Sequence, residues 1–176
     1  MPQDLRYPIG PFSKPKSFTS KDRAGAIEAI AEAPARVRQA VQGLSPDQLA
    51  TPYRPGGWTV RQVVHHLPDS HMNAYVRCKL ALTEDQPTVK PYAEARWAEL
   101  RDATEALVET SLTLLEVLHE RWVMLLRSLK PADFARTLKH PEIGVIDLDF
   151  LMAMYSWHGR HHVAHITSLR ERMGWS

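Results

Sequence analysis

Apolar side chains recur every three or four positions along four long segments of the chain. This spacing predicts four helices, because it gathers the apolar side chains on one face of each. The segments cover residues 21 to about 42, 60 to about 83, 92 to about 129 and 148 to about 173. No segment predicts a large sheet, so the pattern favours an all-α four-helix bundle that forms a single domain over residues 1–176.

Capping residues indicate where these helices begin and end. Ser20, Thr59 and Asp147 are the expected N-caps of the first, second and last helices, and Gly174 follows the end of the last one. The third segment is long for one helix of a globular protein, so we expect a break near residues 104–111.

Two other segments differ from the helical pattern. Residues 1–18 contain four prolines and predict an N-terminal arm, which we expect to pack on the parent bundle or on a partner subunit through Tyr7, Ile9 and Phe12. Residues 136–147 place a turn between two short stretches with strand character, which predicts a small hairpin.

Composition narrows the class of protein. Lys and Arg total 22 against 20 for Asp and Glu, so electrostatic binding to nucleic acid is not expected. No apolar run approaches the roughly 20 residues of a membrane span, and the N-terminus lacks the apolar core of a signal peptide. We therefore expect a cytoplasmic protein without a membrane partner. Cys78 is the only cysteine, so the ligands of a metal site would be His, Asp or Glu.

Most of the 9 histidines lie in two clusters. The last predicted helix carries four on one face: His158, His161, His162 and His165. The second predicted helix carries three: His65, His66 and His71. Two pairs with i, i+4 spacing overlap in the last helix, and either pair can offer two imidazoles to one metal ion. Spacing does not decide between them, and the third ligand is expected from the second helix.

Three imidazoles would leave a divalent ion with an open coordination position, as in catalytic zinc sites. Nickel and iron also accept imidazole, so the donor set does not fix the metal. Asp69 shares a helix face with His66 and is a candidate general base, or a partner that orients a histidine. No HExxH motif is present, which disfavours the mechanism of zinc-dependent metalloproteases.

Four stretches resemble a known family: LRYPIGPF (5–12), TPYRPGGWTVRQVVHHLPDSHMN (51–73), LHERWVMLLRSL (118–129) and WHGRHHVAHITSLRERMGWS (157–176). Through these stretches the chain resembles the DinB/YfiT-like family. The resemblance extends over nearly the whole chain. The resemblance implies a four-helix bundle that forms a homodimer. It also implies one divalent metal ion per subunit, with zinc favoured over nickel. It implies the ligands His66, His158 and His162. It implies that His65, His161 and His165 are not ligands but lie next to the ligands or line the pocket of the ion.

The resemblance implies two activities for one site. A hydrolase would activate water against a small-molecule substrate, and an S-transferase would activate a low-molecular-weight thiol such as bacillithiol or mycothiol. Asp69, His161 and His165 are the candidates for proton transfer or for orienting a ligand. Two other classes remain open. One is a non-catalytic, metal-stabilised binding or stress-response module. The other is a structural bundle with incidental histidines.

Overall fold

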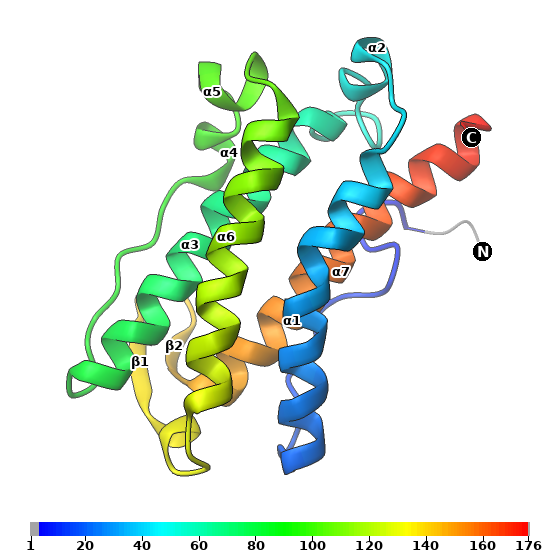
Figure 1. Cartoon of the computed structure of the whole chain (residues 1–176). Coiled ribbons are helices and arrows are strands. Elements are labelled where there is room, and N and C mark those ends of the chain that lie inside the picture. Colours follow the sequence, from blue (N-terminus) through cyan, green and yellow to red (C-terminus); the bar gives the residue numbers. More distant parts are fainter. Residues whose placement is uncertain (1–3, 176) are drawn as a thin grey trace.

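The computed structural model describes residues 4–175 and contains four long helices. These are α1 (Ser20–Val41), α3 (Val60–Thr83), α6 (Val108–Ser128) and α7 (Leu148–Met173). Helices α1 and α3 each pack against both α6 and α7. In Figure 1, α1 and α7 run upward while α3 and α6 run downward, so two of the four packed pairs are parallel. The four-helix bundle predicted from the sequence is confirmed.

Shorter elements connect the long helices. They are α2 (Pro46–Leu49), α4 (Glu94–Trp97), α5 (Arg101–Thr104), the 3-10 turn η1 (Asp133–Ala135), β1 (Thr137–His140) and β2 (Gly144–Asp147). The two strands form an antiparallel hairpin, with Thr137 opposite Asp147 and His140 opposite Gly144. Both the hairpin and the break before α6 agree with the sequence-based predictions.

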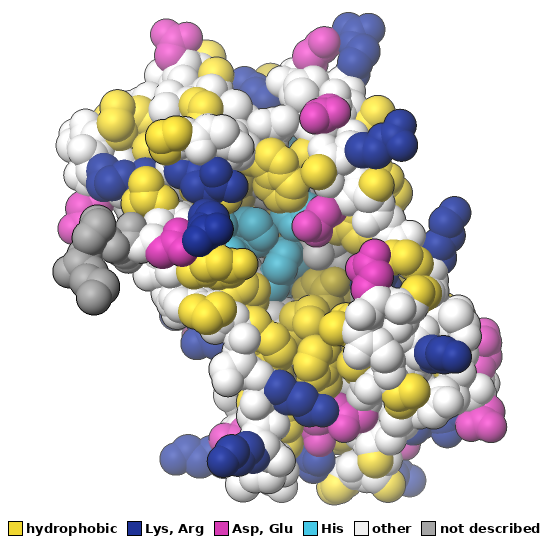
Figure 2. All heavy atoms as spheres, turned by 180° about the vertical axis from the view of Figure 1, so that it is seen from behind, with side chains coloured by type: hydrophobic (Ala, Val, Ile, Leu, Met, Phe, Trp, Pro, Cys, Tyr) yellow, Lys and Arg dark blue, Asp and Glu magenta, His cyan; other side chains and the backbone are white. Residues whose placement is uncertain are grey.

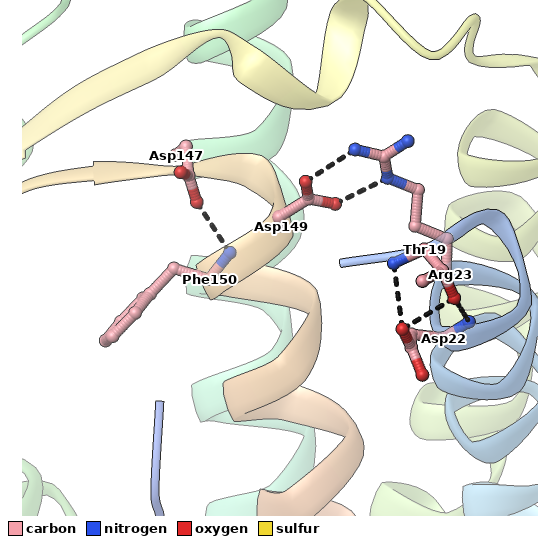
Figure 3. A network of polar contacts seen from close by, with 6 residues as sticks. All are labelled: Thr19, Asp22, Arg23, Asp147, Asp149 and Phe150. Atoms are coloured by element: carbon pink, nitrogen blue, oxygen red, sulfur yellow. Dashed lines mark hydrogen bonds and ion pairs between the residues drawn. The ribbon is translucent and has the colours of Figure 1, made fainter. Parts of the chain in front are cut away.

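The start of α1 differs by one residue from the prediction. Thr19 is the N-cap, and Ser20 is the first helical residue. The Thr19 side chain accepts from the Asp22 backbone N–H, and the Asp22 carboxylate accepts from the Thr19 backbone N–H, as Figure 3 shows. This reciprocal arrangement needs an acceptor three residues after the cap. Thr19 has Asp22 at that position, whereas Ser20 would have Arg23.

The other predicted caps are present. Thr59 begins α3 and forms the same reciprocal pair with Gln62. The Asp147 carboxylate accepts from the Phe150 backbone N–H at 2.7 Å at the start of α7. Gly174 follows α7 with φ 65°, a left-handed conformation that favours glycine.

An ion pair joins the starts of the parallel helices α1 and α7 (Figure 3). Nε and Nη2 of Arg23 donate to the two carboxylate oxygens of Asp149 at 2.8 and 2.7 Å. Only 21% and 16% of the two side chains are exposed, so the pair is partly shielded from water. Two parallel hydrogen bonds also constrain the relative orientation of the two side chains. This contact therefore helps to set the position of α7 along α1.

Large apolar side chains fill the interior of the bundle. The most deeply buried include Ile30, Leu67, Leu115, Trp122, Leu126, Met152 and Ile166. Helix α3 continues through Pro68, which is itself buried. Among the described residues, no helix has both the length and the apolar composition needed to cross a membrane.

The described part of the N-terminal arm lies along α7. The Phe12 ring meets the Phe150 ring edge-on, with centroids 5.5 Å apart. The Trp157 indole N–H donates to the Gly10 carbonyl at 3.2 Å. Tyr7 is 42% exposed, yet its ring centroid lies 5.8 Å from that of His161. The arm therefore packs along α7 beside His161, at the edge of the clustered histidines. Residues 1–3 of the predicted arm lie outside the described part of the chain.

Candidate metal centre

Three imidazoles from two antiparallel helices converge on one point. His66 comes from α3, and His158 and His162 come from successive turns of α7. One ring nitrogen of each lies within 4.8 Å of those of the other two. Nε2 of His66 is 3.2 Å from Nε2 of His158, so these two atoms face the common point. These are the three residues that the family resemblance designates as ligands.

The separation of these nitrogens suits a metal ion. Zinc–imidazole bonds of about 2.0–2.1 Å at tetrahedral angles place two ligand nitrogens about 3.3 Å apart. The 3.2 Å between the His66 and His158 nitrogens matches that value. Within the described part of the chain, no carboxylate joins this cluster, so its donors there are the three imidazoles. The residues present therefore fit a divalent ion that prefers nitrogen ligands.

Burial keeps the three imidazoles neutral. It lowers the pKa of His66 to about 4. Burial also holds the pKa of His158 and of His162 well below the ordinary value, and the neighbouring histidines lower both further. A neutral imidazole has a lone pair on one ring nitrogen, and metal binding requires that lone pair. The site is therefore in the protonation state that binds a metal at neutral pH.

A cleft of about 430 Å³ opens on the three imidazoles. Figure 2 shows histidine side chains at the bottom of this hollow, with basic side chains on one side and an acidic one on the other. Among residues 4–175, the charged side chains that line it are those of Arg6, Arg54 and Glu94. Trp58 and Trp157 supply aromatic walls, and the Trp58 ring centroid lies 4.7 Å from that of His66. The site is thus accessible to a small molecule.

The loop before α3 holds two of these side chains over the cleft. The Tyr53 backbone N–H donates to the Trp58 carbonyl at 3.0 Å, which closes a tight loop. A Cβ at Gly57 would lie 2.7 Å from Cγ of Arg54, so only glycine fits inside the loop. The glycine therefore permits the conformation that places Arg54 and Trp58 at the mouth of the site.

A second cavity of about 440 Å³ adjoins the first, and His158 and Glu94 line both. Its walls include Ser70 and Tyr155, whose hydroxyl oxygens lie 3.5 Å apart, and the side chain of Arg77. A substrate bound at the three imidazoles can therefore extend to either side of His158.

The remaining predicted site residues divide into two groups. His161 and His165 line the cleft. The His161 ring stacks on that of Trp157, with centroids 4.2 Å apart, and His165 contacts His162 directly. Both therefore lie beside the three converging imidazoles.

Two expectations do not match the structure. His65 faces away from the site: its Nδ1 lies 2.7 Å from the Ser111 hydroxyl and its Nε2 lies 3.2 Å from the Ala106 carbonyl. The prediction that His65 lies around the ion or in its pocket is therefore wrong. His65 is next to His66 in α3, and neighbouring helix positions point about 100° apart. Asp69 does not line the cleft, and within residues 4–175 its carboxylate makes no hydrogen bond to an imidazole. Burial, with a contribution from Asp102, raises the pKa of Asp69 to about 6.

Two further histidines contact the site: His71, which belongs to the cluster predicted on the second helix, and His119, which the sequence analysis does not identify. Nε2 of His71 lies 3.1 Å from Nδ1 of His158, and Nδ1 of His71 lies 2.8 Å from Nε2 of His119. The sequence contains one signal for His119. It interrupts the apolar stripe of α6 between Leu115 and Trp122, and a buried imidazole needs polar partners.

The sequence of this chain is similar to those of known proteins. Residues 29–166 match the model of the DinB superfamily. A relative from Bacillus mycoides (strain KBAB4), named "Putative metal-dependent hydrolase", is 54% identical over 173 residues, with 98% of this chain and 99% of the relative covered. A relative of the same name from Bacillus cereus (strain ATCC 10987 / NRS 248) is 54% identical over 172 residues, with the same coverage.

A solved structure is also closely similar. It is described as "YfiT from Bacillus subtilis is a probable metal-dependent hydrolase with an unusual four-helix bundle topology". The TM-score is 0.95 at 49% sequence identity, and the alignment covers 98% of this chain and 99% of the other.

Proposed function

This chain belongs to the DinB superfamily, and from that premise we propose that it is a metal-dependent hydrolase acting on a small molecule. The proposal assigns one divalent ion to His66, His158 and His162. The observation that carries it is the convergence of these neutral imidazoles, without a carboxylate, at the bottom of an open cleft. The names of the relatives support the same class of activity.

The bound ion would act as a Lewis acid and lower the pKa of a water molecule on its open position. The protein's own contribution is positioning. Arg6 and Arg54 line the same cleft as the three imidazoles, so they attract and orient an anionic group of the substrate. Trp58 and Trp157 provide apolar walls that exclude bulk water from the reacting groups.

His161 is the residue that we propose to transfer a proton. It lines the cleft without belonging to the ligand set. Its ring is held flat against Trp157, with an interplanar angle of 19°. In a His161→Phe variant the aromatic contact remains and both ring nitrogens are lost. We expect this variant to bind the metal and to lose about 100-fold or more in kcat, as for removal of a general base.

The test of the activity is a screen of ester and amide substrates. We expect turnover by the zinc- or nickel-loaded protein without added thiol, and none by a His158→Ala variant. A His65→Gln variant is the matched control, because His65 is a buried histidine of α3 that faces away from the site. Consumption of an electrophile such as monochlorobimane only with a low-molecular-weight thiol would replace the hydrolase by an S-transferase.

A further inference from the structure

A chain of buried hydrogen bonds leads from His158 across the bundle to α1. Nδ1 of His158 lies 3.1 Å from Nε2 of His71. Nδ1 of His71 lies 2.8 Å from Nε2 of His119. Nδ1 of His119 lies 2.6 Å from the backbone carbonyl oxygen of Ile30. His71 is 0% exposed and His119 is 2% exposed, so no bulk water can substitute for these partners.

The carbonyl at the end of this chain fixes the position of every proton along it. A carbonyl oxygen only accepts, so Nδ1 of His119 must carry its proton and Nε2 must accept. Nδ1 of His71 must then donate to His119, and Nε2 of His71 must accept from Nδ1 of His158. The proton of His158 is thereby held on Nδ1. Its lone pair is on Nε2, the atom that faces His66.

A second and shorter chain acts on His162 in the same way. Nε2 of His165 lies 3.0 Å from the carbonyl oxygen of Arg6, so Nε2 must donate and Nδ1 must accept. Nδ1 of His165 lies 3.3 Å from Nδ1 of His162, which therefore carries the proton. The lone pair of His162 is then on Nε2. Two α7 histidines thus have their tautomers set by backbone carbonyls of different segments, α1 and the N-terminal arm.

Reversing either chain would be unfavourable in the interior. If the proton of His158 moved to Nε2, its Nδ1 and the Nε2 of His71 would present two lone pairs to each other. If His71 responded by reversing, its Nδ1 and the Nε2 of His119 would present two lone pairs to each other. Buried polar groups left without a partner cost about 1–3 kcal/mol each. The carbonyl ends therefore favour one proton arrangement over its alternatives.

From this arrangement we propose that His71, His119 and His165 are positioning residues of the metal site. They hold His158 and His162 in the Nδ1–H tautomer, with the Nε2 lone pairs directed at the point shared with His66. The metal site is then preorganised before an ion binds. This inference rests on the proposed function for its ligand assignment. Replacing the hydrogen-bond partner of a metal-bound histidine typically weakens metal binding by about 10–100-fold.

Substitutions at His119 separate positioning from simple packing, because His119 touches none of the proposed ligands. In His119→Gln, the amide oxygen can accept from His71 and the amide N–H can donate to the Ile30 carbonyl, so the direction of the chain is kept. In His119→Met, a side chain of similar volume has neither a strong donor nor a strong acceptor. The two variants therefore differ mainly in the hydrogen bonds that they can make.

The readouts are the dissociation constant for zinc, measured by chelator competition, and the imidazole ¹⁵N chemical shifts of the full-length metal-free protein. For His119→Met we expect about 10–100-fold weaker zinc binding and a mixture of His158 tautomers. For His119→Gln we expect wild-type tautomers and zinc affinity within about threefold of wild type. Weaker binding by the Met variant with an unchanged His158 tautomer would mean a purely structural role and would overturn the proposal.

The wild-type spectrum alone is a test that needs no variant. We expect protons on Nδ1 of His71, His119, His158 and His162, and on Nε2 of His165. A proton on Nε2 of His119 or His158 would overturn the inference. If these tautomers are present but the protein binds neither zinc nor nickel, the proposed function fails while the hydrogen-bonded chains stand. The two ideas can therefore fail separately.

Discussion

His119 should make the stability of the metal-free protein depend on pH. Burial lowers the pKa of its imidazole from 6.5 to about 4 in the folded state, although its hydrogen bond to Ile30 acts in the opposite direction. Between those two values the unfolded chain binds a proton that the folded chain does not. The free energy of unfolding must therefore fall as the pH falls through this window.

The size of the effect follows from the two pKa values. Lowering the pH from 7.0 to 5.5 protonates an imidazole of ordinary pKa in the unfolded chain and leaves the folded one neutral. The His119 contribution to the free energy of unfolding then decreases by about 1 kcal/mol. In His119→Gln this group no longer titrates, so the variant should lose about 1 kcal/mol less than wild type over the same interval.

The assay is urea unfolding of chelator-treated protein at several pH values, followed by circular dichroism. Between pH 7.5 and 8.5 neither state of His119 titrates, so the difference between wild type and variant should be constant there. Below pH 6.5 the two curves should converge or cross as wild type loses stability faster. Parallel curves from pH 7.0 to 5.5 would contradict a lowered pKa for His119, because they would show that His119 takes up its proton without unfolding.

Two further predictions concern the packing of α7. Replacing Arg23 with Met should lower the free energy of unfolding by about 1–3 kcal/mol, because it leaves the partly buried Asp149 carboxylate unpaired. Arg36→Met, in an exposed i, i+4 pair, should change it by less than about 0.5 kcal/mol; equal effects in denaturant unfolding would contradict this assignment. A Cβ at Gly159 would lie 3.2 Å from Cβ of Ala33, so Gly159→Ala should weaken zinc binding by displacing α1 from α7. Adding Ala33→Gly should restore the affinity, and a double variant as weak as the single one would sink this explanation.

Local sequence signals predict most of the fold. Caps such as Thr59 and Asp147 act within one helical turn, and the hairpin depends on neighbouring residues, so both are visible without tertiary structure. The start of α1 is misplaced because two consecutive hydroxyl residues compete as N-cap. The acidic residue at the third helical position decides in favour of Thr19.

The metal site is predictable only in part. Helical spacing places histidines of α7 on one face, but it cannot choose between two overlapping pairs, and the family resemblance is needed for that choice. The roles of His71 and His119 depend on the packing of α1, α3 and α6 around α7, which no local pattern contains. His65 is misassigned for a different reason: it is next to the ligand His66, and neighbouring helix positions point about 100° apart, so it contacts Ser111 instead of the site.

The most direct test of the proposed metal centre is metal analysis of purified protein, with X-ray absorption on the bound ion. We predict about one equivalent of a divalent metal in the wild type, bound by nitrogen and oxygen ligands with an open or water-filled position. His162→Ala should lose the metal, and the matched control His65→Gln should retain it. A wild-type protein that binds neither zinc nor nickel, or a His162→Ala variant with full occupancy, would contradict the account.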